Sequence, residues 1–178
     1  MLTWLLTAAA IVAALLLWRG FNSTKRNLPR VGDPAPEFRL PDQHGTARSD
    51  AEFRGKWLVL YFYPKDETPG CIEQALRFRD SMAVLEAQGA AVCGVSVDDS
   101  TSHAAFARKH KLPFPLLADR DGATAARYGS LRNFGFVKFA KRNTFLIDPE
   151  GRIAKVRLGV SPSKNAADVA SDLQALRA

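Results

Sequence analysis

The 178-residue sequence is poor in cysteine, with only Cys71 and Cys93. Two cysteines cannot form the disulfide framework that holds many small secreted domains together, so the composition does not imply secretion. A domain of about 150 residues can bury a sufficient core without disulfides. The sequence also lacks internal repeats and low-complexity tracts. We therefore expect one folded domain with a short segment appended to it.

Charge is absent from the beginning of the sequence, where no charged residue precedes Arg19. The next residues hold Arg19, Lys25, Arg26 and Arg30 without an acid, and these four account for more than half of the net charge of +7. The rest of the chain is therefore only mildly basic. This distribution argues against a nucleic-acid-binding surface.

The uncharged beginning is also a continuous apolar run from Leu2 to Trp18. Its 17 residues would span roughly 25 Å as a helix, near the lower limit for crossing a bilayer core of about 30 Å. Trp4 and Trp18 stand near its ends, where interfacial aromatic residues occur. A cleaved signal peptide is one alternative, although it would carry its positive charge before the apolar run. A buried or disordered tail is another.

We expect residues 1–19 to form an uncleaved membrane anchor, 20–30 a basic linker and 31–178 the folded domain. The basic residues follow the apolar run and none precedes it. The positive-inside tendency then predicts a single-pass protein with its folded domain on the cytoplasmic side. Basic residues at this position would also favour anionic lipid.

Strand and helix patterns alternate along the expected domain. The segments 57–63 and 91–97 are continuous apolar runs, typical of strands buried on both faces of a parallel sheet. Helices are expected at 71–88 and, after the Asp98-Asp99-Ser100 cap, at 100–110. Further expected elements are a strand at 38–40, a turn at 42–45, a helical turn at 50–55, strands at 114–117, 142–148 and 153–158, and helices at 123–128 and 163–176. This order predicts an α/β fold with a central mixed sheet flanked by helices.

The stretch from Tyr61 to Gln74 places a cysteine where thiol chemistry is favoured. An apolar strand leads into a loop, and the loop ends at Cys71, where a helix is expected to begin. The thiolate is the reactive form of cysteine, and the N-terminus of a helix stabilises it. The position of Cys71 directly after Pro69-Gly70 therefore predicts a nucleophile rather than an inert buried thiol.

The spacing Pro64-x-x-x-Thr68-x-x-Cys71 resembles the active-site signature of the peroxiredoxins. The wider sequence from Tyr61 to Gly70, with Phe78-Arg79-Asp80, is similar to the bacterioferritin comigratory protein (PrxQ-type) branch of the alkyl hydroperoxide reductase/thiol-specific antioxidant family. The resemblance covers the whole expected domain and implies a thioredoxin-like fold of the peroxiredoxin type. It also implies a thiol-dependent peroxidase that reduces hydrogen peroxide and organic hydroperoxides through a cysteine sulfenic acid.

The resemblance assigns catalytic roles to four residues. Cys71 would attack a peroxide oxygen, Thr68 would hydrogen-bond the sulfur or the peroxide, and Pro64 would shape the pocket and limit the access of water. Arg142 matches a family arginine at the start of the Thr-Phe-Leu-Ile-Asp strand, where its guanidinium would stabilise the thiolate and the leaving oxygen. Gln74 falls where the family often carries a Glu or Gln that supports this arginine. The alternatives are an ordinary loop threonine, a proline that ends a strand and a surface arginine.

The sequence departs from this branch at the residue that would resolve the sulfenic acid. Many members carry a second cysteine five residues after the first, where this chain has Leu76. Cys93 lies in an apolar strand and is expected to be a small core residue, with a resolving role as the alternative. We therefore expect a one-cysteine enzyme, monomeric or homodimeric, whose partner is an external thiol: thioredoxin, glutaredoxin or glutathione.

The loop at residues 129–139 mixes phenylalanines with Arg132 and Lys138 and looks shorter than is usual for the branch. Its phenylalanines are expected to lie in the core or at a dimer surface, with contact to a membrane surface as the alternative. No metal or cofactor is expected. His44, His103 and His110 lack the spacing of a metal site, although His103 and His110 could share a helix face, and all three are expected to be exposed.

Two other functions use the same thiol. A thioredoxin-like dithiol–disulfide oxidoreductase would need Cys-x-x-Cys, but the position three residues after Cys71 is Gln74. A non-catalytic redox sensor would oxidise the same cysteine without turnover, and the sequence does not separate it from an enzyme.

Overall fold

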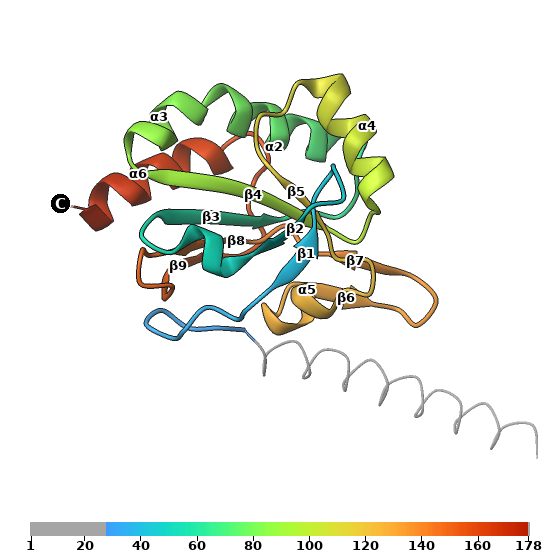
Figure 1. Ribbon diagram of the computed structural model, residues 1–178, viewed down its shortest axis with the longest axis horizontal. Helices are drawn as coiled ribbons and strands as arrows, with labels where there is room; N and C mark the ends of the chain where they lie inside the picture. The colour runs from blue at the N-terminus through green and yellow to red at the C-terminus, as the bar shows by residue number, and fades with distance from the viewer. Residues whose placement is uncertain (1–27, 178) are drawn as a thin grey trace, which may run out of the picture.

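The computed structural model describes residues 28–177, which form a three-layer α/β domain (Figure 1). Its centre is a five-stranded sheet of order β5-β4-β3-β8-β9. Strands β3 (Trp57–Phe62), β4 (Ala90–Ser96) and β5 (Leu116–Ala118) are parallel, whereas β8 (Thr144–Ile147) and β9 (Ile153–Arg157) continue the sheet in antiparallel order. The predicted central mixed sheet is confirmed.

Helices cover both faces of this sheet. Four helices pack on one face: α2 (Pro69–Asp80), α3 (Met82–Ala87), α4 (Ser100–His110) and α6 (Asn165–Arg177). The other face is covered by the 3-10 helix η1 (Asp50–Phe53), by α5 (Ala123–Arg127) and by the segment that precedes η1. Two small hairpins lie outside the main sheet, β1 (Arg39–Pro41) with β2 (Ala47–Ser49) and β6 (Leu131–Asn133) with β7 (Lys138–Ala140).

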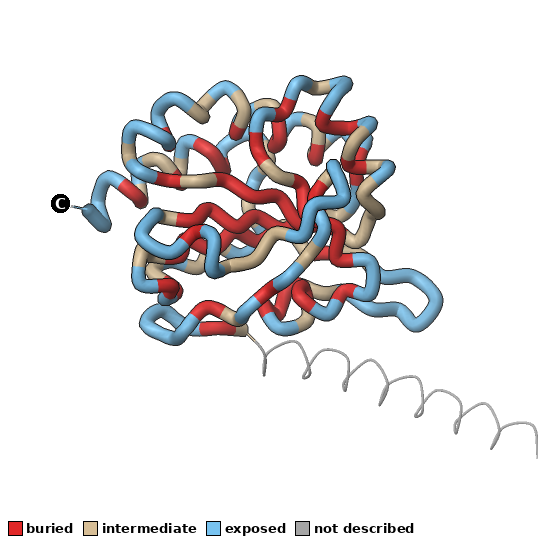
Figure 2. Tube along the Cα trace, viewed as in Figure 1, coloured by how far each residue is buried: buried red, intermediate tan, exposed pale blue. Residues whose placement is uncertain are grey.

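The alternation of side chains along the strands divides the core into two clusters. In β3, Val59 and Tyr61 face the four-helix side, whereas Leu58, Leu60 and Phe62 face the opposite side. All five are buried, and the central strands appear as continuous buried segments in Figure 2. Because alternate residues of a strand point to opposite faces, two residues can be close in sequence and still lie on different sides of the sheet.

The helix predicted over 71–88 is in fact two helices. Ser81 ends α2 and begins α3, and its N–H donates to the carbonyls of Arg77 and Phe78. The break turns α3 toward β4, so that Leu85 is buried in the core and Val84 stays exposed. Helix α4, by contrast, begins as predicted, with the Asp99 side chain accepting a hydrogen bond from the Ser102 N–H at 2.9 Å.

The segment predicted as a loop at 129–139 is mostly the β6–β7 hairpin. Phe134 and Phe136 are exposed and Phe139 is only half-buried, so a place in the core, one half of the expectation, is wrong. The other half, a dimer surface, stays a prediction. The strands are three residues each, too short for their alternation to be recognised in the sequence.

Within residues 28–177, no helix is both long enough and apolar enough to cross a bilayer. The predicted anchor at residues 2–18 lies outside the described part of the chain, as does most of the predicted linker.

Candidate active site

Cys71 lies in the first turn of α2, which follows the loop after β3. Its side chain is buried, with 1% of the residue exposed. The N–H groups of Cys71 and Ile72 both donate to the Thr68 carbonyl at 2.9 Å, so they are used inside the first turn rather than directed at the sulfur. The N-terminal end of the α2 dipole still favours a negative charge at this position.

The hydrogen-bond donor that reaches the sulfur is the Arg142 side chain. Nη2 of Arg142 lies 3.3 Å from Cys71 Sγ. Nη1 donates to Gln74 Oε1 at 2.5 Å and to the Gly70 carbonyl at 3.3 Å, which fixes the plane of the guanidinium. A side chain at Gly70 would interfere, because an added Cβ would lie 3.2 Å from Arg142 Nη2. The Pro69-Gly70 pair therefore starts the helix and leaves room for the arginine.

A series of hydrogen bonds between buried side chains supports Arg142. Gln74 is completely buried, and its Nε2 donates to Asn165 Oδ1 at 2.8 Å. The same Asn165 oxygen accepts a hydrogen bond from Thr144 Oγ1 at 2.9 Å. Gln74 thus links Arg142 to the first residue of α6 and the first residue of β8. The sequence did not predict the roles of Asn165 and Thr144, because only the fold brings each of them next to its hydrogen-bond partners.

The structure does not direct the Thr68 hydroxyl at the sulfur. Thr68 Oγ1 donates to the Lys65 carbonyl at 3.1 Å. Glu67 between them has φ of 59°, a left-handed conformation that folds the loop back and brings this carbonyl within reach. Pro64 is half-buried and lies two residues after the end of β3. Both residues therefore belong to the loop that carries Cys71, and the roles that the resemblance gives them stay predictions.

The same loop is fixed to α4 by a buried carboxylate. Asp66 accepts hydrogen bonds from Tyr63 Oη at 2.8 Å and Ser102 Oγ at 2.7 Å, and its Oδ2 lies 2.8 Å from His103 Nδ1. Burial opposes the charged form of Asp66, but the bonds from His103, Ser102 and Tyr63 outweigh it and lower the pKa of this carboxyl. The expectation that His103 is exposed is therefore wrong, because it is fully buried against Asp66.

Further bonds join the loop to its surroundings. The Asp66 N–H donates to Asp98 Oδ2 at 2.9 Å, and Lys109 Nζ contacts Glu67 Oε2 at 2.6 Å. His44 is exposed, whereas His110 is half-buried and lies 3.4 Å from Glu67. In the part of the chain that the structure describes, no three His, Cys, Asp or Glu side chains are grouped so as to hold a metal ion.

Cys93 lies on the opposite face of the sheet from Cys71. Cys71 packs in the cluster under the four helices, whereas Cys93 packs with Phe62 and Tyr128 on the other side. Both cysteines are free thiols. Cys93 is completely buried, and this burial raises the pKa of its thiol far above the usual value. The Cys93 thiol is uncharged and lies on the other face of the sheet, so it is not placed to attack a sulfenic acid on Cys71.

Tyr61 forms an aromatic wall on the Cys71 side of the sheet. Its ring stacks on Phe78 with centroids 4.7 Å apart. Its hydroxyl is buried and finds no hydrogen-bond partner among residues 28–177. Burial raises the pKa of Tyr61 well above its usual value. Tyr61 is therefore a neutral, water-excluding neighbour of the site.

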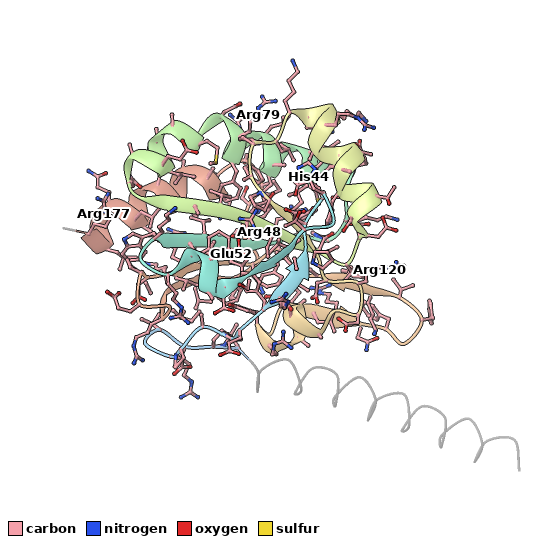
Figure 3. All side chains as sticks on the ribbon, viewed as in Figure 1. His44, Arg48, Glu52, Arg79, Arg120 and Arg177 are labelled. Atoms are coloured by element: carbon pink, nitrogen blue, oxygen red, sulfur yellow. The ribbon has the colours of Figure 1, made fainter. Side chains whose placement is uncertain are left out.

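A cleft of about 520 Å³ lies at the other end of the sheet, lined by residues that include Arg48, Glu52 and Met82. Arg48 and Glu52 are labelled in Figure 3. It borders the beginning of β4, whereas Cys71 follows the end of β3. Its size does not make it the reactive site, because no thiol lines it.

Cys71 is buried at the N-terminus of a helix that packs on a thioredoxin-like sheet, and it accepts a hydrogen bond from a guanidinium. This combination defines a cysteine-dependent redox enzyme. Residues 31–156 match the model of the AhpC/TSA family. The chain is 42% identical over 147 residues to a putative peroxiredoxin bcp of Coxiella burnetii, covering 80% of this chain and 97% of the relative. It is also 42% identical over 129 residues to peroxiredoxin Bcp of Bacillus subtilis, covering 70% and 82%.

Solved structures agree with these relatives. Peroxidoxin BcpB of Mycobacterium tuberculosis superposes with a TM-score of 0.80 at 33% identity, covering 84% of this chain and 99% of the other. A bacterioferritin comigratory protein of Xanthomonas campestris, whose alkyl peroxide reduction activity was studied through trapped-intermediate and ligand complexes, gives 0.72 at 34% identity, covering 78% and 90%. The chain therefore belongs to the AhpC/TSA family, the peroxiredoxins, and is a thiol-dependent peroxidase of the Bcp/PrxQ branch.

Proposed function

We propose that Cys71 is the peroxidatic nucleophile and that Arg142, held by Gln74, stabilises the charge on its sulfur and on the departing oxygen. The observation that carries this proposal is the 3.3 Å contact between Arg142 Nη2 and Cys71 Sγ. A guanidinium stays charged at every relevant pH and offers several donors in one plane. Fixed donors aimed at developing charge are among the largest single contributions to catalysis.

The reaction conserves atoms and electrons in two halves. The Cys71 thiolate attacks the terminal oxygen of a hydroperoxide, an S–O bond forms, and the O–O bond breaks. The departing oxygen takes a proton and leaves as water or an alcohol, and Cys71 becomes a sulfenic acid. Pro64 limits the access of water to this site, and Thr68 binds the peroxide oxygens once its hydroxyl turns away from Lys65.

The second half uses an external thiol, because Cys93 lies across the sheet and Leu76 replaces the usual resolving cysteine. An external thiol condenses with the sulfenic acid, which releases water and leaves a mixed disulfide. A second thiol then displaces Cys71 and restores it. Thioredoxin, glutaredoxin with glutathione, and glutathione alone are the candidate reductants. Hydrogen peroxide and alkyl hydroperoxides are the substrates, and alkyl peroxide reduction is the activity described for the Xanthomonas relative.

Steady-state turnover tests both halves. Consumption of hydrogen peroxide and of tert-butyl hydroperoxide is followed with each of the three reductants, for the full chain and for Cys71→Ser and Cys93→Ser. We expect Cys71→Ser to abolish turnover and Cys93→Ser to keep it. Loss of turnover in Cys93→Ser with an intact fold would instead assign Cys93 the resolving role. A single oxidation of Cys71 without turnover under every reductant would favour a redox sensor.

We also propose that residues 1–19 anchor the enzyme in a membrane as a single-pass segment and that residues 31–178 lie on the cytoplasmic side. The uncharged run from Leu2 to Trp18 and the basic residues that follow it support this arrangement. Protease protection on intact cells tests it. Digestion of the folded domain from outside would contradict the cytoplasmic orientation.

A further inference from the structure

The β6–β7 hairpin holds three apolar side chains out into solvent. Phe136 is 94% exposed, Phe134 is 55% exposed and Val137 is 44% exposed. The tip is ordered by its own bonds: Phe134 N–H donates to the Val137 carbonyl, and Gly135 N–H donates to Asn133 Oδ1, both at 2.9 Å. These apolar groups therefore stand on a structured turn, where nothing in the described chain covers them. Grouped exposed apolar residues of this kind mark contact surfaces.

The flanks of this hairpin are positively charged. Residues 120–141 contain Arg120, Arg127, Arg132, Lys138 and Lys141. Their one acid is Asp121, whose carboxylate accepts the Ala123 N–H at 2.8 Å. The Lys138 ammonium donates a hydrogen bond to the Asp121 backbone carbonyl at 3.1 Å rather than to the Asp121 carboxylate. Arg120 is exposed on the flank from which the hairpin projects (Figure 3). Apolar residues at a tip with basic residues behind it match an anionic lipid interface.

The described chain begins beside the base of the same hairpin. Leu28 packs against the same core cluster as Leu131, and a Cβ added at Gly129, two residues before β6, would lie 3.0 Å from Leu28 Cα. Figure 1 shows the beginning of the described chain and α5 on one side of the sheet, next to the hairpin. The sequence before Leu28 contains the apolar run that ends at Trp18. An extended chain rises at most about 3.5 Å per residue, and Leu28 is ten positions after Trp18, so this side lies within about 35 Å of Trp18.

We propose that the β6–β7 hairpin docks on the surface of an anionic phospholipid bilayer. Phe134, Phe136 and Val137 enter the interfacial region, and the flanking arginine and lysine side chains contact the headgroups. Strand β7 ends two residues before Arg142, so docking places the reactive site next to the lipid. This consequence rests on the proposed peroxidase function and implies that hydroperoxides of phospholipid acyl chains are substrates.

Tryptophan quenching by brominated lipid tests the docking itself. The full-length Phe136→Trp variant is reconstituted in phosphatidylcholine vesicles with and without phosphatidylserine, in which part of the phosphatidylcholine is brominated. Val84→Trp is the matched control, because Val84 is 53% exposed but lies on α3, on the four-helix side of the sheet. Trp4, Trp18 and Trp57 are common to both variants and to wild type, so difference spectra isolate the new residue.

We expect the Phe136→Trp emission to shift to shorter wavelength and to be quenched several-fold more than that of Val84→Trp, with the larger effect in phosphatidylserine. Equal quenching at the two positions would overturn the proposal. So would Phe136-dependent self-association in sedimentation, since a second copy of the chain would then be the occupant.

A kinetic test separates this inference from the proposed function. Wild type and the Phe134→Ser/Phe136→Ser double variant are compared on a phospholipid hydroperoxide in vesicles and on hydrogen peroxide in solution. We expect the ratio of the two rates, lipid to hydrogen peroxide, to fall several-fold in the double variant and to stay unchanged in Val84→Ser. An unchanged ratio in the double variant would overturn the docking proposal, while an absence of turnover on both substrates in wild type would overturn the peroxidase function itself.

Discussion

Arg142 and Cys71 are 71 positions apart in the chain, and their side chains meet at 3.3 Å. The sheet accounts for this contact. Strand β8 runs antiparallel to β3, with Thr144 opposite Tyr61, so β8 begins at the edge where β3 ends. The Phe62 N–H donates to the Asn143 carbonyl at 2.8 Å and extends this pairing toward the site. The loop after β3 and the residues before β8 are thereby brought to one place.

Replacing Arg142 tests whether its charge supports the reaction. We expect Arg142→Met to lower the second-order rate of Cys71 oxidation by about 10²–10³-fold, the range found when one donor to a developing negative charge is removed. Arg142→Lys should lose less, since it keeps the charge but not the planar set of donors. Stopped-flow measurement of peroxide-dependent oxidation gives the rates. Lys141→Met is the matched control, because the Lys141 ammonium lies on the Gly129 carbonyl, and a comparable loss there would contradict the specific role of Arg142.

Gln74 is expected to act by positioning Arg142. In Gln74→Leu the guanidinium loses its 2.5 Å partner, and we expect the oxidation rate to fall by about tenfold, or about 1.4 kcal/mol of barrier. Gln74→Glu should keep the rate, because a carboxylate still accepts from Arg142. The Asn165 Nδ2 group, which has no partner among residues 28–177, can turn to donate to it. Equal losses in both variants, measured with unfolding by urea as a check on the fold, would argue against this positioning role.

Cys93 is expected to matter for stability and not for turnover. Cys93→Ala should cost about 1 kcal/mol of unfolding free energy through a small cavity, and Cys93→Ser about 1–3 kcal/mol because it buries a hydroxyl among apolar side chains. Both should retain peroxidase activity. Denaturation by urea and turnover assays measure the two effects separately. An active-site thiol would show the reverse pattern, with activity lost and stability kept.

The buried Asp66 should give the fold a dependence on acid pH. Its folded-state pKa is lowered, so the unfolded chain binds a proton that the folded chain does not. The stabilisation is therefore complete above the unfolded-state pKa of about 3.9 and is lost as the pH falls through the folded-state value. We expect the difference in unfolding free energy between wild type and Asp66→Asn to shrink as the pH falls below about 4.

Urea titrations at a series of pH values measure this difference. Asp80→Asn serves as the control for loss of a carboxylate, because Asp80 is exposed on α2 and pairs with Arg79 at 2.8 Å. If the difference in unfolding free energy between wild type and Asp66→Asn does not change with pH, a charged, hydrogen-bonded Asp66 is contradicted.

The sequence predicts the sheet because its strands carry strong local signals. The apolar runs at 57–63 and 91–97 correspond to β3 and β4, and the cap before Ser100 marks the start of α4. The elements that were missed depend on weak or distant signals. Ser81 breaks a helix whose apolar pattern continues across it, and the β6–β7 strands are too short to show a period.

The site was predictable where a continuous motif describes it. Cys71 and its loop follow from a motif in one stretch of sequence, and Arg142 was added through the family resemblance. His103 was expected to be exposed, but packing of the loop against α4 buries it beside Asp66. The bond from the Thr68 hydroxyl to the Lys65 carbonyl depends on the loop conformation, and the catalytic role of Thr68 stays a prediction. Asn165 likewise gains its place only when α6 packs against α2.

The most direct test of the account is the oxidation state of the two cysteines after one equivalent of hydrogen peroxide. The full chain is oxidised in the presence of a sulfenic-acid trap and mapped by mass spectrometry. The account predicts the trap on Cys71 and a free thiol at Cys93. A disulfide between Cys71 and Cys93 would contradict the one-cysteine mechanism, and an unmodified Cys71 would contradict its role as the peroxidatic nucleophile.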